Sequence, residues 1–348
     1  MSFKIGKFSI GSDHRPFIIA EMSGNHNQSL DRALELVDAA AAAGAHALKL
    51  QTYTADTITI DHKGGLFDIK DENSLWKGKN LHDLYQEAHT PWEWHEPIFN
   101  RARELGMVGF SSPFDESAVD FLENLNVPAY KIASFESNHH PLLRKVAATG
   151  KPVIISSGAS RLDEIYESVR VLREAGAKQI CVLKCTSTYP ATPENTNLRT
   201  IPVFREVFPD CTVGLSDHTM GIGVSVAAVA LGACVIEKHF TLRRADGGVD
   251  SAFSLEPSEL ADLVTETERS WQAMGSVQLD TQKAEEKSRQ FKRSIYVVQD
   301  ISAGEVFTRE NLRVIRPGDG MAPAFYEQVL GRKASADMKR GTPFKLFP

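Results

Sequence analysis

Cysteine is scarce in this chain of 348 residues, and none of its four cysteines forms a CxxC pair. They lie mostly inside apolar runs, where a thiol behaves as a small hydrophobic side chain. This usage fits a reducing compartment, so we expect a cytoplasmic protein. The four residues are Cys181, Cys185, Cys211 and Cys234.

Other absences narrow the class of protein further. The first eleven residues lack the apolar core of a secretory signal. The longest uncharged run, residues 219–236, is interrupted by Gly221, Gly223 and Gly232, so we interpret it as helix, turn and strand rather than a membrane span. The net charge is -6 and no Lys/Arg-rich stripe occurs, which argues against nucleic-acid binding through broad phosphate neutralisation.

What the chain does have is a globular composition, with 42% hydrophobic and 24% charged residues, and a regular pattern of short apolar runs. Eight of these runs alternate with amphipathic helical stretches, as in βα units whose strands are covered on both faces. The expected strands are 17–20, 47–50, 108–110, 129–132, 153–155, 180–183, 212–215 and 235–237.

Eight βα repeats in roughly 275 residues match the size of a (β/α)₈ barrel, the TIM-barrel fold. A doubly wound open sheet is the competing topology. Neither GxGxxG nor GxxxxGK[ST] follows the first strand, where a nucleotide-binding open sheet would carry it, so the barrel is favoured.

The composition of the sequence changes after Met274, where a polar, charged stretch leads to short strand-like runs punctuated by glycine and proline, namely 294–298, 313–315 and 344–347. We therefore predict a catalytic barrel domain over residues 1–280, a linker over 281–290 and a small β-rich domain over 291–348. A domain of this size buries only a limited core by itself.

Polar residues follow every predicted strand at its carboxyl end, where the active site of a TIM barrel lies. For one strand, such a residue can simply mark the edge of the core. Polar residues follow all eight strands, however, and some of them are lysines in apolar surroundings, where an ammonium group needs an anionic partner. This pattern favours a bound phosphate or carboxylate. The residues include Glu21, Lys49, Gln51, Ser112, Lys131, Ser134, Glu136, Ser156, Lys184, Ser187, Tyr189, Ser216, Asp217, His218, Glu237, Lys238 and His239.

Two histidines, His218 and His239, follow neighbouring strands and can converge on one ion. A single histidine at a strand end is more often hydrogen-bonded than metal-bound, so the structural alternative stays open. A nitrogen and oxygen environment without thiolate suits Mn²⁺ or Mg²⁺, with Zn²⁺ as a further option.

Six stretches of the barrel region resemble the sialic acid synthase family, and the C-terminal region resembles that family's antifreeze-like (SAF) domain. The barrel stretches are IIAEMSGNH (18–26), KLQTY (49–53), YKIASFE (130–136), KCTSTYP (184–190), GLSDHT (214–219) and IEKHF (236–240). The SAF stretches are RSIY (293–296), GE (304–305), NL (311–312) and RPG (316–318). The resemblance thus spans essentially the whole chain.

The resemblance implies a metal-dependent condensation of phosphoenolpyruvate with the open-chain aldehyde of an N-acylated amino sugar. It implies Mn²⁺, with Mg²⁺ or Co²⁺ as alternatives, on His218 and His239. Implied phosphoenolpyruvate ligands are Lys49, Ser112, Lys131, Ser134, Ser156 and Ser216, and implied catalytic acids are Glu21, Glu136 and Asp250. Implied sugar-binding residues are Gln51, Ser187, Tyr189 and Arg316.

In the family, the arginine at position 316 enters the barrel mouth of the other subunit, which implies a domain-swapped homodimer. Within the family, segments 53, 76, 90–95, 135–137 and 186–189 are most similar to the pseudaminic acid synthase branch. The implied acceptor is 2,4-diacetamido-2,4,6-trideoxy-altrose, and the implied product serves flagellin or cell-surface polysaccharide glycosylation.

Three alternatives remain at this point. A sialic or legionaminic acid synthase would take an N-acetylmannosamine-type sugar. A class I aldolase would form a Schiff base on Lys131 or Lys184. A sugar- or ice-binding protein would use only the C-terminal module, but it would not need polar residues at all eight strand ends.

Overall fold

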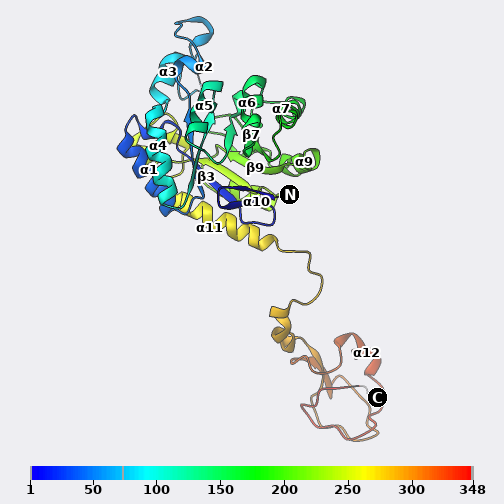
Figure 1. Cartoon of the computed structure of the whole chain (residues 1–348). Helices are drawn as coiled ribbons and strands as arrows, with labels where there is room; N and C mark the ends of the chain where they lie inside the picture. The colour runs from blue at the N-terminus through cyan, green and yellow to red at the C-terminus, as the bar shows by residue number, and fades with distance from the viewer. Residues whose placement is uncertain (1, 73, 346–348) are drawn as a thin grey trace. The chain divides into compact units, whose positions relative to one another are not determined.

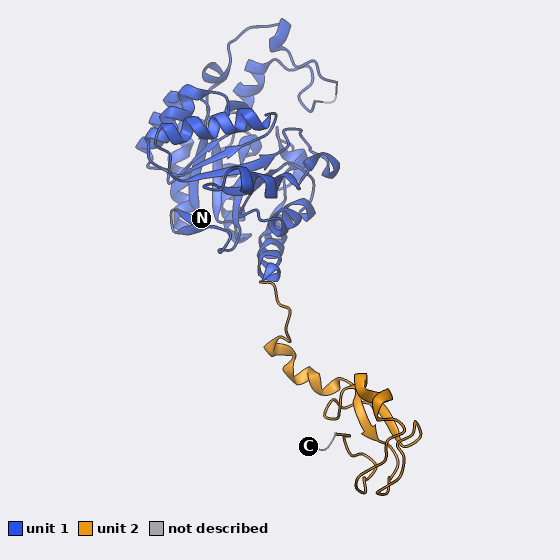
Figure 2. Cartoon of the chain, turned by 90° about the vertical axis from the view of Figure 1, so that its right-hand side faces the viewer, with its two compact units in different colours: residues 1–275 blue, residues 276–348 orange. Residues whose placement is uncertain are grey.

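The computed structural model describes residues 2–72 and 74–345. The chain divides into two compact units, residues 1–275 and 276–348, coloured blue and orange in Figure 2. The predicted three-part division into 1–280, 281–290 and 291–348 stays a prediction.

The first unit is built on a closed barrel of eight parallel strands in the order β10-β3-β4-β5-β6-β7-β8-β9. The predicted TIM barrel is thereby confirmed. The strands are β3 (Phe17–Glu21), β4 (Ala47–Thr52), β5 (Val108–Pro113), β6 (Tyr130–Ile132), β7 (Val153–Ser156), β8 (Ile180–Cys185), β9 (Thr212–Asp217) and β10 (Val235–His239). Most of them extend beyond the predicted apolar run into polar residues, because ladder pairing continues there regardless of side-chain polarity.

Helices surround the strands, as Figure 1 shows, and bury apolar faces against them. They are α1 (Leu30–Ala42), α2 (Ala55–Ile58), α3 (Leu81–Ala88), α4 (His95–Glu104), α5 (Glu116–Asn124), α6 (His140–Ala148), α7 (Leu162–Glu174), α8 (Pro193–Thr196), α9 (Thr200–Val207), α10 (Gly223–Ala230) and α11 (Pro257–Met274). Short 3₁₀ turns include η1 (Ser23–His26), η3 (Trp92–Trp94), η4 (Ser134–Glu136) and η6 (Ser251–Phe253).

Helix α1 illustrates how the local sequence sets these boundaries. The Ser29 hydroxyl accepts a hydrogen bond from the Arg32 amide at 3.3 Å and caps the first turn. Its buried residues, among them Leu36 and Val37, recur at helical spacing on the face toward the barrel. Gly44 follows with φ of 86°, which ends the helix before β4.

A hairpin that was not predicted from the sequence precedes the barrel. Strands β1 (Ser2–Ile5) and β2 (Phe8–Gly11) pair antiparallel around Gly6 and Lys7, and Ile5 and Ile10 are fully buried. The hairpin lies ahead of the alternation of apolar runs and amphipathic helices from which the strands were predicted, so that pattern did not indicate it.

The second unit has its own small core around β11 (Ser294–Val297) and β12 (Leu312–Ile315), which pair antiparallel. Its short helix is α12 (Tyr326–Val329). The run 344–347, expected to be strand-like, ends outside the described residues, and Pro343 forms one isolated bridge with Tyr296. Among the described residues, no helix is long and apolar enough to cross a bilayer.

Candidate active site

The polar residues of the barrel meet in its interior, as one ion pair across the barrel demonstrates. Lys131 lies on β6 and Glu237 on β10, which stand opposite each other in the closed strand order. Their Nζ and Oε1 atoms are nevertheless 3.3 Å apart. This contact requires both side chains to point inward.

Alternation along each strand decides which of its polar residues take part. On β10, Glu237 and His239 face the interior, whereas the Lys238 ammonium donates to Asp217 at 3.0 Å and to the carbonyl of Thr219. On β8, the Lys184 ammonium is bonded to the Thr186 hydroxyl and a backbone carbonyl. Two of the four strand lysines are therefore satisfied without any bound anion.

Lys49 and Lys131, the other two, form a buried charge network with Glu21 and Glu237. Lys49 is ion-paired with Glu21, and its Nζ lies 3.7 Å from Glu237 Oε1. The exposed fractions of Lys49 and Lys131 are only 3% and 2%. Two cations so deeply buried are costly unless anions surround them.

The pKa values in this network move in opposite directions. Burial raises the pKa of Glu21 and outweighs the attraction of Lys49. Burial also acts to raise the pKa of Glu237, but Lys131 and Lys49 outweigh it and the net pKa lies below its usual value. For the Lys49 ammonium, burial acts to lower the pKa, yet the two carboxylates prevail and raise it. The lysine therefore stays charged.

Four serines from four strand ends lie around the network or beside it. Ser112 Oγ accepts from Lys49 Nζ at 3.1 Å, and Ser216 Oγ donates to Glu237 Oε1 at 3.4 Å. Ser134 Oγ accepts from the Gly158 amide at 3.1 Å. Ser156 Oγ is buried with no hydrogen-bond partner among the described residues, as expected of a donor that awaits a ligand.

The two histidines come together as predicted. Their ring centroids are 5.3 Å apart, and both residues are less than a tenth exposed. His218 Nδ1 lies 3.0 Å from the Thr186 carbonyl, which can only accept, so this nitrogen carries a proton and, in the neutral ring, Nε2 has the lone pair. His239 Nδ1 has no hydrogen bond to a described residue and lies 3.7 Å from Asp250 Oδ2.

Aromatic rings pack around the histidine pair. The Tyr189 ring lies 4.6 Å from that of His218, and the Phe253 ring lies 4.9 Å from that of His239. Trp76 lies 5.7 Å from Tyr189, and its Nε1 donates to the Val249 carbonyl at 3.0 Å. Phe253 was not predicted as a site residue, because the short η6 turn in which it lies gives no periodic signal.

A second set of hydrogen bonds connects two of the predicted catalytic acids, Glu21 on β3 and Asp250 after β10. Gln51 Nε2 donates to Glu21 Oε1 at 3.2 Å and to Ser23 Oγ at 3.3 Å. Ser23 Oγ in turn donates a hydrogen bond to Asp250 Oδ2. Burial is the largest influence on Asp250 and raises its pKa.

Glu136 lies on η4, directly after β6, and is half-buried. Burial raises its pKa to about 7, and its Oε2 atom has no hydrogen-bond partner among the described residues. A carboxyl group with this pKa can both accept and donate a proton near neutrality.

The remaining predicted sugar-binding residues are placed differently. Ser187 Oγ lies 3.7 Å from Cys185 Sγ. A Cβ atom on Gly158 would lie 2.0 Å from this Ser187 oxygen. Cys185 Sγ is 3.9 Å from His218 Nδ1, a neighbour that the sequence did not indicate. Arg316 follows β12 in the second unit, is exposed and forms no ion pair with a described residue.

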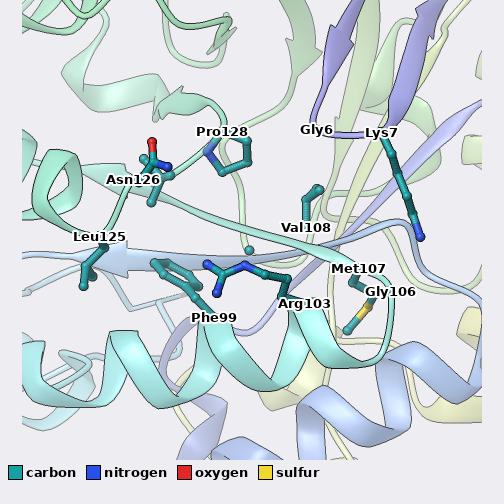
Figure 3. A pocket seen from close by; sticks show the side chains of 12 residues that line it. Gly6, Lys7, Phe99, Arg103, Gly106, Met107, Val108, Leu125, Asn126 and Pro128 are labelled. Atoms are coloured by element: carbon teal, nitrogen blue, oxygen red, sulfur yellow. The ribbon is translucent and has the colours of Figure 1, made fainter.

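A cavity of about 510 Å³ lies at the opposite, amino-terminal end of the strands (Figure 3). Its lining includes the hairpin turn at Lys7, the end of α4 at Arg103, and Val108 at the start of β5. It contains none of the predicted site residues. Residues 2–72 and 74–345 contain no cluster of three or more histidine, cysteine or acidic side chains placed to hold a metal ion.

Comparison with known proteins gives matches along the whole chain. The NeuB family model matches residues 36–279 and the SAF domain model matches residues 292–346. "Pseudaminic acid synthase" of Campylobacter jejuni is 43% identical over 342 residues, covering 98% of each chain. "Pseudaminic acid synthase" of Helicobacter pylori is 42% identical over 329 residues, covering 94% of this chain and 96% of its own.

A solved structure supports the same relationship. The N-acetylneuraminic acid (sialic acid) synthetase of Leptospira borgpetersenii, in complex with citrate, superposes with a TM-score of 0.73 at 32% identity. The match covers 83% of this chain and 95% of that chain.

Proposed function

Because the chain belongs to the NeuB family and carries a SAF domain, we propose that it catalyses the synthesis of pseudaminic acid. In this reaction, carbon 3 of phosphoenolpyruvate attacks the open-chain aldehyde of 2,4-diacetamido-2,4,6-trideoxy-altrose. Water adds at carbon 2, and phosphate leaves. The observation that carries the proposal is the similarity, along nearly the full length, to two pseudaminic acid synthases.

The two histidines fit a divalent metal ion. His218 offers Nε2 because its Nδ1 is held by a carbonyl, and the buried His239 has a ring nitrogen, Nδ1, without a hydrogen bond to any residue that the structure describes. Two imidazoles leave the other coordination positions to oxygen ligands, a donor set suited to Mn²⁺, with Mg²⁺ or Co²⁺ as alternatives. The ion, when bound, would polarise the aldehyde as a Lewis acid.

The charge network is the place for phosphoenolpyruvate, whose carboxylate and phosphate are both anionic. Lys49 and Lys131 supply two buried cations, which bind anions strongly where water is excluded. The hydroxyl groups of Ser112, Ser134, Ser156 and Ser216 would complete the site. The free hydroxyl of Ser156 supports this assignment, because no described residue competes for its proton.

The three acids have separate positions and therefore separate tasks. Glu136, with its pKa of about 7, is suited to take a proton from the water that adds at carbon 2. Asp250 lies beside His239, where the aldehyde would bind, and Glu21 lies against Lys49 in the donor site. Gln51, Ser187 and Tyr189 would bind the sugar next to the histidine pair.

Arg316 and the quaternary structure also belong to the proposal. We expect a domain-swapped homodimer in which Arg316 of one copy completes the barrel mouth of the other. Its exposed guanidinium, which forms no ion pair with a described residue, is available for such a contact. We further expect a cytoplasmic enzyme that acts on phosphoenolpyruvate and an N-acylated amino sugar, without nucleic-acid or membrane partners.

Phosphate release from phosphoenolpyruvate with a panel of N-acyl amino sugars tests the function. We expect release with the 2,4-diacetamido-2,4,6-trideoxy sugar, its loss on chelation and its recovery with Mn²⁺. A preference for N-acetylmannosamine would instead indicate a sialic acid synthase. Covalent trapping of substrate by borohydride on Lys131 or Lys184 would indicate a Schiff-base aldolase.

A further inference from the structure

Ser23 connects two of the catalytic acids through separate atoms. Its backbone amide donates to Glu21 Oε1 at 3.0 Å, and its side-chain hydroxyl donates to Asp250 Oδ2. The same hydroxyl accepts from Gln51 Nε2 at 3.3 Å. Ser23 is 4% exposed, so solvent does not replace these bonds. One residue thereby links β3, β4 and the segment after β10.

The backbone of Ser23 adopts a conformation that its side chain disfavours. Its φ is +48°, in the left-handed region where residues other than glycine are uncommon. Such strain persists where the surrounding structure enforces it, and it concentrates at functional sites. Glycine would relieve the strain at this position, but it lacks the hydroxyl group from which Asp250 accepts a hydrogen bond.

Gly24 permits the close approach that brings Ser23 to Asp250. A Cβ atom on Gly24 would lie 2.4 Å from Val249 Cγ2 and 3.1 Å from the Ala88 carbonyl oxygen. Any larger residue would therefore push the 248–250 segment away from η1. The Ser23–Asp250 contact thus depends on close packing of two segments that are more than 200 residues apart in sequence.

We propose that Ser23 is a positioning residue for the condensation, an inference that rests on the proposed function. Its hydroxyl fixes the Asp250 carboxylate beside His239, where the aldehyde would bind, and its amide fixes Glu21 beside Lys49 in the donor site. Ser23 thereby holds the acid near the aldehyde and the acid near phosphoenolpyruvate in a fixed relative position before either substrate binds. A preorganised arrangement of this kind lowers the reorganisation required in the transition state.

The test compares Ser23→Ala and Ser23→Gly in the full chain. Both remove the hydroxyl group, and Ser23→Gly also relieves the left-handed backbone, so a variant that folds is available even if the alanine is poorly tolerated. We expect kcat to fall about tenfold or more in both, with the KM for phosphoenolpyruvate within about twofold of the parent. We also expect Ser23→Gly to melt no lower than Ser23→Ala. Ser251→Ala is the matched control, because the hydroxyl of that buried serine donates to the Gly248 carbonyl and to no other described residue.

A double-mutant cycle with Asp250→Ala shows whether Ser23 acts through this acid. We expect Ser23→Ala to cost less than about twofold once Asp250 has been removed, because its partner is then absent. Equal losses in both backgrounds, or unchanged kcat in the single variants, would overturn the positioning role. Failure of the parent chain to release phosphate with every sugar would instead refute the proposed function, and with it the inference.

Discussion

The imidazole rings of His218 and His239 lie 5.3 Å apart, centroid to centroid, and the strand register explains why. Strands β9 and β10 are neighbours, and Asp217 pairs with Lys238 in the ladder. The next residue is the histidine in both cases: His218 directly follows β9, and His239 is the last residue of β10. Alternation then directs both rings toward the interior while Asp217 and Lys238 bond each other outside it. Two residues that are 21 positions apart thus form one candidate metal site.

Replacing either histidine should remove metal-dependent turnover and leave the fold intact. We expect His218→Ala and His239→Ala each to lower kcat about 100-fold or more, since Lewis-acid stabilisation is worth several kcal/mol. Melting temperatures should change by less than about 5 °C, because neither ring anchors a strand. The exposed His62 provides the control, as His62→Ala. Wild-type response to Mn²⁺ in both variants would contradict the metal assignment.

Replacing Lys131 by methionine should weaken binding of phosphoenolpyruvate, whereas replacing Lys238 by methionine should lower the stability of the fold. Lys131→Met removes a buried cation from the donor site while Glu237 keeps Lys49 nearby, so the KM for phosphoenolpyruvate should rise about 10- to 100-fold. Lys238→Met leaves that KM unchanged and lowers the free energy of unfolding by a few kcal/mol, because Asp217 loses its buried partner. Steady-state kinetics and urea unfolding measure the two effects. Similar KM values in the two variants would mean that Lys131 does not bind the donor.

The sequence was enough to predict the barrel because each strand is an apolar run and each helix has an amphipathic period. It was also enough to expect polar residues together at the carboxyl ends, since this follows from topology alone. The strand pattern alone did not separate Lys49 and Lys131 from Lys184 and Lys238, and only the family resemblance singled out the first two. Which lysine faces inward depends on strand alternation combined with the partners available on neighbouring elements, such as Thr186.

The features that sequence reasoning missed depend on contacts between distant segments. Phe253 packs on His239 and Ser23 bonds Asp250 because loops after β3 and β10 meet above the strand ends. No spacing rule connects residues that far apart. The β1–β2 hairpin was missed for a different reason, since it precedes the alternation of strands and helices on which the prediction was based.

Glu136 should make stability depend on pH in an identifiable way. Its pKa is about 7 in the folded chain, above the 4.5 of an unperturbed glutamate, so between these values the folded state binds the additional proton. The contribution of Glu136 to the free energy of unfolding is therefore fully present below about pH 4.5. It falls by up to about 3 kcal/mol as the pH rises through 7. We expect Glu136→Gln to remove this part of the decline. Urea unfolding of both chains from pH 4.5 to 8 measures the difference, and parallel curves would show that the Glu136 pKa is not raised.

Mixing two inactive variants tests whether Arg316 serves the barrel of another copy. Arg316→Ala leaves its own barrel intact, and His239→Ala leaves its own arginine intact, so a mixed dimer would contain one complete site. If subunits exchange at random, half of the dimers are mixed and activity should recover to about a quarter of the parent value. Each variant alone should stay far below this level, and both should remain dimeric in light scattering, because neither change alters the fold. If activity does not recover after subunit exchange has been verified, Arg316 acts at the barrel of its own chain or lies outside the site. The barrel mouth would then have to bind its acceptor sugar without a residue from a second chain.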